Sequence, residues 1–234
     1  MDIGGYKKRL ILALKILINE GIFEQTMGHI SVRIPETGQI LIPGHIHKLG
    51  RTLESLTEDD LAVIDIEGNW LDGKLKPPGE RFIHTEVYRL RPEINSVVHA
   101  HPPLSVAFGI AGEQILPCHH RGTIFRPFVP IHQYPAQVNS KELGEEVART
   151  LGQGYACLLR GHGTVCVGET PEEAAVVAIT LETAALHQMR VKSLGREPQI
   201  IEDQYLDGYF IKGIDREEFF ANPWTYYSSK LPKD

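Results

Sequence analysis

Residues 95–107 read NSVVHAHPPLSVA, an apolar run that ends in two histidines and a double proline. The run predicts a buried strand, and residues i and i+2 of a strand project from the same face. His99 and His101 are therefore expected to point together, with Ala100 facing the other way. Because the two prolines cannot continue a ladder of hydrogen bonds, the histidine pair is expected at a strand end.

Two imidazoles on one face of a strand can coordinate one metal ion, at nitrogen–metal distances of about 2.0–2.1 Å. A third ligand is then needed, and His162 is the leading candidate. It lies in RGHGT, residues 160–164, where flanking glycines let the backbone turn tightly and approach a ligand closely. The alternative is that His99 and His101 are hydrogen-bonded core histidines and that His162 is a turn residue. The combination of motifs favours the metal site.

The composition is that of a globular protein. The 234 residues are 42% hydrophobic and 23% charged, and no repeat or long linker divides them. We therefore predict one domain over residues 1–234, with residues 200–234 forming a C-terminal tail that packs at a subunit interface. The net charge of −6, without a basic run, argues against nucleic acid or an anionic membrane as a partner.

The cysteines and the N-terminal segment bear on the cellular compartment in which the protein is expected. Cys118, Cys157 and Cys166 form no CxxC pair, and their odd number argues against a disulfide framework, so a reducing, cytoplasmic compartment is predicted. Residues 1–21 lack the uninterrupted apolar stretch of a signal peptide and predict an amphipathic helix. No run of about 18 apolar residues predicts a membrane span.

Helical and strand patterns alternate along the chain. Strands are predicted at residues 29–34, 39–42, 61–66 and 94–101 and as two runs within 156–167, and the first of them alternates like a half-buried strand. Helices are predicted in the N-terminal segment and at residues 79–93 and 169–195. Thr170, Pro171 and Glu173 form the start signal of the last helix, with a cap, a first-turn proline and a capping box.

Two longer segments carry a family resemblance. PPGERFIHTEVYRLRPEINSVVHAHPP, residues 77–103, and LLRGHGTVCVGETPEEAAVVAITLETAA, residues 158–185, resemble the class II aldolase/adducin family. The resemblance implies an α/β fold: a single-domain, three-layer α/β/α arrangement with a central, largely antiparallel sheet. It also implies a homotetramer with active sites between neighbouring subunits.

The same resemblance implies roles for four residues. His99, His101 and His162 match the metal ligands, and Glu80 matches the catalytic acid/base, whose proton transfer needs a pKa raised toward neutrality. The alternative for Glu80 is an ordinary first-turn carboxylate favoured by the helix dipole. One divalent ion per subunit is expected. Zinc suits three histidines best, and manganese, iron(II) and cobalt also fit.

A metal site of this kind stabilises the negative charge that develops when a carbon–carbon bond breaks. Retro-aldol cleavage and decarboxylation share that need, so the substrate pocket must discriminate between them. Sugar-phosphate aldolases of the family hold phosphate with Gly-Asn, Thr-Gly and paired serines. This chain instead has His29 at the first place, Gly44-His45 with His47 near the second, and Pro78-Gly79 at the third.

These departures favour a carboxylate substrate without phosphate, bound through His29, His45 and His47. The alternative is a phosphate held by other donors. Arg121 is a further candidate for carboxylate binding, since arginine forks suit carboxylates, but a surface or interface role is equally open. Tyr227 is a candidate because some family members place a C-terminal tyrosine in the neighbouring subunit's site; alternatively, it docks the tail.

We therefore predict a metal-dependent carbon–carbon lyase, with a decarboxylase of a hydroxylated aromatic carboxylate favoured. The first alternative is an aldolase acting on a hydroxy-keto acid or a sugar, phosphorylated or not. The second is a non-catalytic assembly domain like the head of adducin. The complete set of Glu80, His99, His101 and His162 favours an enzyme.

Overall fold

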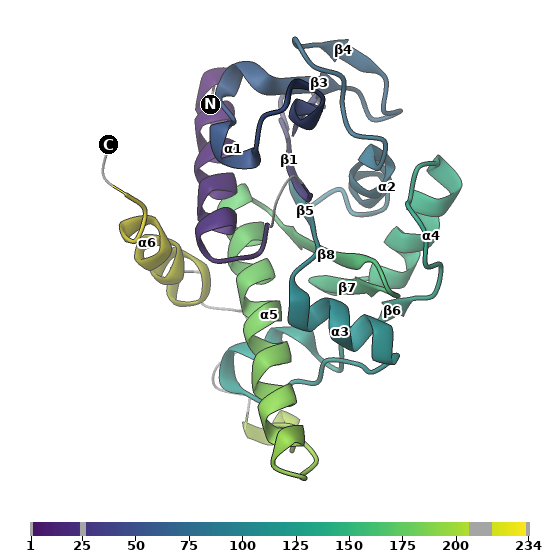
Figure 1. Cartoon of the computed structure of the whole chain (residues 1–234), viewed down its shortest axis with the longest axis vertical. Coiled ribbons are helices and arrows are strands. Elements are labelled where there is room, and N and C mark those ends of the chain that lie inside the picture. The colour runs from purple at the N-terminus through teal and green to yellow at the C-terminus, as the bar shows by residue number, and fades with distance from the viewer. Residues whose placement is uncertain (1, 24–26, 206–216, 233–234) are drawn as a thin grey trace.

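A computed structural model describes residues 2–23, 27–205 and 217–232 of the chain (Figure 1). Its central feature is one sheet of eight strands within those residues, in the order β4-β3-β2-β1-β5-β8-β7-β6. Neighbouring strands are antiparallel except for the parallel pair β6 and β7, which confirms the prediction of a largely antiparallel sheet. The strands are β1 (His29–Arg33), β2 (Ile40–Pro43), β3 (Leu61–Ile64), β4 (Trp70–Asp72), β5 (Ser96–Ala100), β6 (Ile131–His132), β7 (Ala156–Leu159) and β8 (Gly163–Gly168).

Helices cover both faces of the sheet, so the fold has the three predicted α/β/α layers (Figure 1). The α-helices are α1 (Ile3–Asn19), α2 (Arg81–Leu90), α3 (Pro103–Ala111), α4 (Lys141–Leu151), α5 (Pro171–Ser193) and α6 (Asn222–Ser229). Short 3-10 helices are η1 (Ile46–Leu49), η2 (Leu53–Ser55), η3 (Glu58–Asp60), η4 (His120–Phe125) and η5 (Asp203–Tyr205), and η6 (Glu217–Ala221) is a π-helix.

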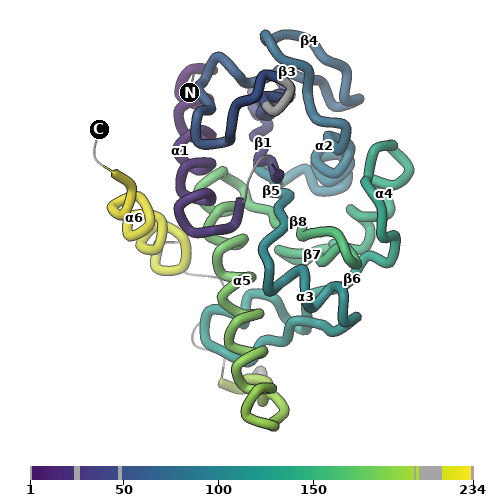
Figure 2. Tube along the Cα trace, viewed as in Figure 1, coloured from purple at the N-terminus to yellow at the C-terminus, as the bar shows by residue number. Residues whose placement is uncertain are grey.

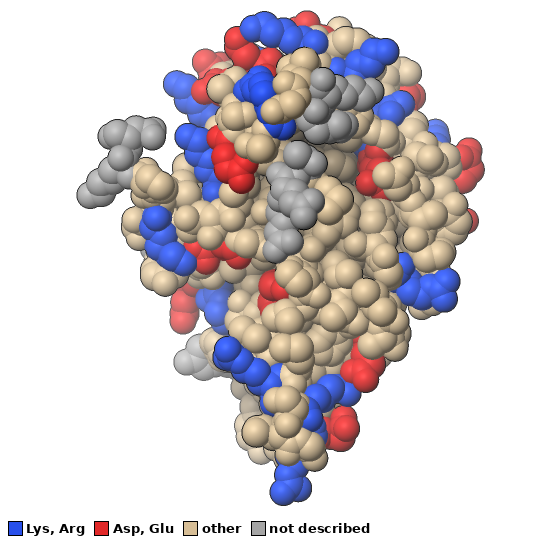
Figure 3. Space-filling model, viewed as in Figure 1, with Lys and Arg blue, Asp and Glu red and all other residues tan. Residues whose placement is uncertain are grey.

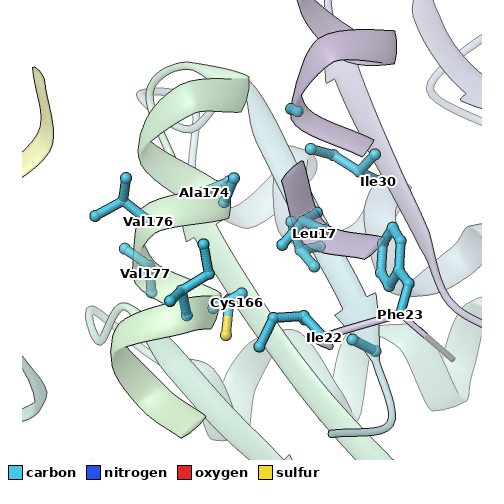
Figure 4. Close-up of a cluster of buried hydrophobic side chains, with 14 of the residues drawn as sticks. Leu17, Ile22, Phe23, Ile30, Cys166, Ala174, Val176 and Val177 are labelled. Carbon is cyan, nitrogen blue, oxygen red and sulfur yellow. The ribbon is translucent and has the colours of Figure 1, made fainter. Parts of the chain in front are cut away.

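The core has two parts, one on each face of the sheet. The first joins α1 and α5 to the sheet and contains Leu17, Ile30, Cys166 and Val177 (Figure 4). The second joins α2 and α4 to the opposite face and contains Val87 and Val147. The three cysteines are free, in agreement with the prediction of no disulfide framework.

Strand β1 corrects one expectation from the sequence. Its alternation predicts a half-buried strand with a solvated polar face, but both faces are covered by helices and only Arg33 is partly exposed. Ile30 lies in the core on the α1/α5 side, so the alternate residues His29 and Ser31 face α2. They are buried polar residues and need hydrogen-bond partners within the protein.

Helix α5 begins where its start signal predicts. The Thr170 hydroxyl accepts a hydrogen bond from the Glu173 amide at 3.3 Å, and Pro171 is the first helical residue. The Glu173 carboxylate accepts from the Glu169 amide at 3.0 Å, one residue before the position that a capping box uses.

The C-terminal segment returns to the body of the fold through α6, which lies on the outer side of α1 and α5 (Figure 2). Trp224, Tyr227 and Leu231 pack against the first core cluster. Within the residues described, no helix has both the length and the apolar character that a membrane span requires. Figure 3 shows acidic and basic side chains interspersed, mostly along the margins of one face.

Candidate metal centre and active site

Three histidines from separate parts of the chain meet beside the end of β5. His99 is in β5, His101 follows the last residue of that strand, and His162 lies in the turn between β7 and β8. The antiparallel pairing of β5 with β8, with His99 opposite Val165, brings the turn to the strand end. The centroid of the His99 ring lies 4.8 Å from that of the His101 ring and 4.9 Å from that of the His162 ring. One ligand atom of each histidine lies within 4.8 Å of the others.

The hydrogen bonding of these rings fits a cation. His99 Nδ1 lies 3.0 Å from the Thr164 carbonyl oxygen, which can only accept, so Nδ1 carries the proton and Nε2 keeps its lone pair. His99 Nε2, His101 Nδ1 and His162 Nδ1 are buried and have no hydrogen-bond partner among the described residues. A buried polar atom in this state needs an explanation, and a divalent ion held by the three imidazoles supplies one for His99 Nε2.

Burial also favours the protonation state that binds metals. It lowers the pKa of His101 to about 3, assisted by the nearby rings of His99 and His162. It lowers the pKa of His162 to about 4, assisted by His99. Both imidazoles are therefore neutral at pH 7, and the neutral ring is the form that donates a lone pair to a metal.

Glu80 lies directly before the first residue of α2 and faces the histidines. Its carboxylate oxygen Oε2 lies 3.7 Å from His99 Nε2, and Oε1 lies 3.4 Å from His162 Nε2. The Val138 amide donates to Oε1 at 3.0 Å, whereas the side chain makes no capping bond to α2. The carboxylate is thus held over the histidine cluster instead of capping its own helix.

The pKa of Glu80 differs from the sequence-based expectation of a value raised toward neutrality. Burial raises the pKa, but contact with His99, the charge of His162 and the Val138 amide lower it more, to about 2. Hydrogen bonds to the charged form of a carboxylate favour that form. Glu80 is therefore an ionised carboxylate at neutral pH, ready to accept a proton.

A cavity of about 550 Å³ opens onto the cluster. His101, His162 and Glu80 form one part of its wall, and the remaining wall comes from strand ends, short helices and loops. The other residues that line it are Met27, Gly28, His29, Pro43, Gly44, His45, Ile46, Leu53, Pro78, Gly79, Gln137 and Gly161. Among these lining residues, none is Lys, Arg, Ser or Thr.

The other sequence-predicted residues divide into two groups. His29 and His45 line the cavity, whereas the side chain of His47 lies outside the described residues. Arg121 donates to the Phe219 carbonyl oxygen, and its guanidinium lies 4.3 Å from the ring centre of Phe219. Neither Arg121 nor Tyr227 reaches this cavity within one chain, so their proposed roles at a substrate remain predictions.

Sequence reasoning missed a set of buried polar residues behind His29. His84, on α2, lies one helical turn beyond Glu80, and its Nε2 lies 2.7 Å from His29 Nδ1. Its Nδ1 lies 2.6 Å from the Ser31 hydroxyl, which is 2.6 Å from the Tyr88 hydroxyl. The i, i+4 spacing of His84 and Tyr88 on one helix face was the available signal.

Burial keeps these imidazoles neutral as well. It lowers the pKa of His84 to about 3, together with the charge of His99. It also lowers the pKa of His29 well below its usual value, together with His84 and His99. His29, Glu80 and His99 form a second group whose ligand atoms lie within 4.8 Å of one another, so geometry alone leaves two candidate ligand sets.

Comparisons with known proteins show what the chain is similar to. The chain is 33% identical over 201 residues to a 3,4-dihydroxyphthalate decarboxylase of Arthrobacter keyseri, covering 82% of this chain and 80% of that protein. It is 29% identical over 193 residues to a 5-methylthioribulose-1-phosphate/5-deoxyribulose-1-phosphate aldolase of Rhodospirillum rubrum, covering 82% and 83%. A solved structure of an L-fuculose 1-phosphate aldolase superposes with a TM-score of 0.79 at 25% identity, covering 88% of this chain and 95% of that one.

The family comparison covers most of the chain. Residues 8–189 match the model of the class II aldolase and adducin N-terminal domain. These residues contain every strand of the sheet together with Glu80, His99, His101 and His162. The chain belongs to the class II aldolase and adducin family.

Proposed function

We propose that this protein is a metal-dependent carbon–carbon lyase that decarboxylates a hydroxylated aromatic carboxylate without a phosphate group. Similarity to a 3,4-dihydroxyphthalate decarboxylase supports this class and makes 3,4-dihydroxyphthalate the first substrate to test. Metal dependence is supported by the grouping of one ligand atom from each of three histidines within 4.8 Å and by the buried His99 Nε2, which has no partner among the described residues. His99, His101 and His162 are the proposed ligands.

The observation that carries the choice of substrate is the composition of the cavity wall. Phosphate is usually held by arginine or lysine side chains, hydroxyl groups and backbone amides at a helix N-terminus. The described lining instead contains imidazoles, glycines, prolines and apolar side chains. Pro78 and Gly79 directly precede Glu80, so no hydroxyl donor precedes the proposed acid/base.

A divalent ion at the three histidines would act as a Lewis acid beside the reacting hydroxyl and carboxylate groups. In this proposal Glu80, ionised at neutral pH, takes the proton of a hydroxyl adjacent to the carboxylate that leaves and delivers it to the ring carbon bearing that carboxylate. The bond to the carboxyl carbon then breaks, its electron pair restores the aromatic ring and carbon dioxide leaves. For 3,4-dihydroxyphthalate, loss of the carboxylate beside the 3-hydroxyl gives 3,4-dihydroxybenzoate.

The environment of Glu80 suits this order of events. A carboxylate with a pKa of about 2 is a weak base in isolation, so it accepts a proton only from a group whose own acidity is raised in the site. The Val138 amide fixes Oε1, which leaves Oε2, on the side of His99, for proton transfer. Zinc is the favoured ion for three neutral imidazoles, with manganese, iron(II) and cobalt as alternatives.

The decisive experiment assays purified, metal-analysed protein for release of carbon dioxide from 3,4-dihydroxyphthalate, with 3,4-dihydroxybenzoate identified as product. In parallel, L-fuculose 1-phosphate and 5-methylthioribulose 1-phosphate are offered and aldehyde is measured. Decarboxylation without aldehyde is the expected result. Aldehyde release without carbon dioxide would instead support the aldolase, which similarity to two sugar-phosphate aldolases keeps as the second candidate.

Two accompanying proposals concern assembly and partners. We expect a homo-oligomer, with a tetramer favoured, that binds a small-molecule carboxylate. An adducin-like assembly domain without catalysis remains the third candidate. Sedimentation of the purified protein tests the oligomer, and activity against both substrate classes separates the enzyme from the assembly domain.

A further inference from the structure

Four buried side chains between β1 and α2 form a continuous hydrogen-bonded series, which we call the relay. It runs from the Tyr88 hydroxyl to the Ser31 hydroxyl, from there to His84 Nδ1, and from His84 Nε2 to His29 Nδ1. The three distances are 2.6, 2.6 and 2.7 Å. His29 is the one relay member that lines the cavity.

The hydrogen bonds of the relay can all be donated in one direction along it or all in the other. If Tyr88 donates to Ser31, then Ser31 donates to His84 Nδ1 and His84 Nε2–H donates to His29 Nδ1. If the order is reversed, Tyr88 must donate to another acceptor, and the Asn95 carbonyl oxygen at 3.4 Å is the one within reach among described residues. That distance is long for a hydroxyl donor, and the Asn95 oxygen already accepts from the Arg33 amide at 2.8 Å. The geometry favours the order that begins at Tyr88.

This order fixes the form of His29. Its Nδ1 is the acceptor of the last bond, and a neutral imidazole with an accepting Nδ1 carries its proton on Nε2. Because Nδ1 points to α2, Nε2 lies on the other side of a ring that lines the cavity. A nitrogen that carries a proton has no lone pair for a metal ion. The relay thus separates the two candidate ligand sets and excludes the one that contains His29.

We propose that the relay holds His29 as a neutral imidazole whose Nε2–H donates a hydrogen bond to a carboxylate oxygen of the substrate, so that His29 is a recognition residue and not a metal ligand. Ser31, His84 and Tyr88 are positioning residues that act through it. The choice of a carboxylate rests on the proposed function. The described cavity lining supports it as well, because that lining contains no lysine or arginine and its side-chain N–H donors are Gln137 and the imidazoles.

The tautomer can be read directly. Protein labelled with ¹⁵N-histidine gives separate long-range ¹H–¹⁵N patterns for the Nε2–H and Nδ1–H forms, and the spectra of His29→Asn and His84→Asn assign the two rings. Both His29 and His84 are expected in the Nε2–H form at pH 7.5. A His29 ring in the Nδ1–H form, or one whose Nε2 shifts on titration with zinc as a ligand does, overturns the proposal. This measurement needs no turnover, so it stands apart from the test of the proposed function.

The recognition role is tested with a matched pair of serine variants. Ser31→Ala breaks the relay. Ser96→Ala removes a fully buried hydroxyl from the neighbouring strand, which donates to the Ser31 carbonyl oxygen at 2.8 Å and takes no part in the relay. The probes are 3,4-dihydroxybenzoate and catechol, which lacks the carboxylate, titrated calorimetrically into zinc-loaded protein. Ser31→Ala is expected to weaken binding of 3,4-dihydroxybenzoate about ten-fold, as for loss of one charge-assisted hydrogen bond, and that of catechol less than two-fold.

Several results overturn the carboxylate contact. The first is an equal loss of affinity for both probes in Ser31→Ala. The second is a loss of affinity for 3,4-dihydroxybenzoate in Ser96→Ala as large as that in Ser31→Ala. The third is failure of the wild-type protein to bind 3,4-dihydroxybenzoate. Tyr88→Phe gives a second variant should Ser31→Ala fold poorly, because Ser31 keeps its bond to His84. In that variant the donor that sets the direction of the relay is missing, so part of the His29 population is expected in the Nδ1–H form, and the affinity for 3,4-dihydroxybenzoate is expected to fall less than three-fold. A His29 spectrum identical to that of the wild type contradicts the role of Tyr88 as the first donor of the relay.

Discussion

His99 and Thr164 lie on adjacent strands, and the Nδ1 atom of His99 donates to the Thr164 carbonyl oxygen at 3.0 Å. The acceptor is a backbone atom, so the orientation of the His99 ring is set by strand pairing and not by another side chain. This places His99 Nε2 toward His101 and His162 without any further partner among the described residues. A backbone acceptor for the second nitrogen of a ligating histidine is typical of metal sites.

Gly163 precedes Thr164, and its lack of a side chain is a requirement of the site. A Cβ there would lie 2.5 Å from the Ala100 carbonyl oxygen and 2.8 Å from His101 Cδ2. We expect Gly163→Ala to displace the ligands, lower the zinc content by more than half and cost about 1–3 kcal/mol of stability. Gly4→Ala in α1 is the control, because Gly4 has no positive φ and its Cβ would meet its nearest neighbour, Asp2 Oδ1, at an ordinary 3.7 Å. Full zinc content in Gly163→Ala would contradict the assignment.

Glu80→Gln tests the acid/base role. The amide keeps the size of the side chain but cannot accept and return a proton, so turnover is expected to fall about 10²–10⁴-fold. Metal content, measured by elemental analysis, is expected to stay near one ion per chain because the three histidines remain. Wild-type activity in Glu80→Gln removes Glu80 from proton transfer, and a metal-free variant would show that its main role is structural.

The three-histidine site predicts dependence on a removable ion. Dialysis against a chelator is expected to abolish carbon dioxide release, and one equivalent of zinc, manganese, iron(II) or cobalt to restore it to different extents. His162→Gln is expected to lower zinc affinity by at least ten-fold while leaving the circular dichroism spectrum unchanged. Activity that persists in chelator with no bound metal rules out the proposed mechanism.

The buried histidines predict a stability that falls in mild acid. The pKa values of His101 and His162 are lowered to about 3 and about 4, whereas an unfolded histidine titrates near 6.5. Below about pH 6.5 the unfolded chain therefore binds more protons, and the free energy of unfolding of metal-free protein drops as the pH falls toward 4. The expected loss between pH 7.5 and pH 5 is about 2 kcal/mol for each such histidine.

Urea unfolding at those two pH values measures this loss, with His162→Gln as the comparison, since it lacks one of the titrating rings. The variant is expected to lose about 2 kcal/mol less than the wild type over the same interval. Glu80 does not interfere, because its stabilising contribution is lost only between about pH 4.5 and pH 2. A wild-type stability that is flat from pH 7.5 to pH 5 contradicts the neutral, buried state of these rings.

Glu182 of α5 links the metal ligands to the helical layer. Its carboxylate accepts hydrogen bonds from the Leu104 and Ser105 amides at 2.8 and 2.9 Å, at the start of α3, directly after the strand end that carries His101. Glu182→Ala is expected to cost about 2–3 kcal/mol in urea unfolding, because two helix N-terminal amides lose a charged acceptor. Glu145→Ala, which removes an exposed pair with Arg149, is the control and is expected to cost less than 1 kcal/mol.

Local sequence patterns were sufficient for six of the eight described strands and for the clustering of His99, His101 and His162, because strand periodicity and glycine-flanked turns act over a few residues. Helix α3 was not predicted, since one of its N-terminal partners, Glu182, lies 77 residues beyond Ser105. Strand β4 escaped notice because it has three exposed residues and little apolar pattern. The bond between His29 and His84 joins positions 55 residues apart, which no local pattern reveals.

The cavity has two kinds of wall, and this division matters for how such proteins diversify. The cation-binding groups are attached to paired strands at the centre of the sheet, whereas much of the remaining wall belongs to the connections at residues 27–29, 43–53 and 78–80. Ile46 and Leu53 of the second connection also belong to the first core cluster, so they are tied to the packing of the fold. The other cavity-lining positions of these connections are the ones at which a substitution would alter which molecule fits while the paired strands keep the imidazoles oriented.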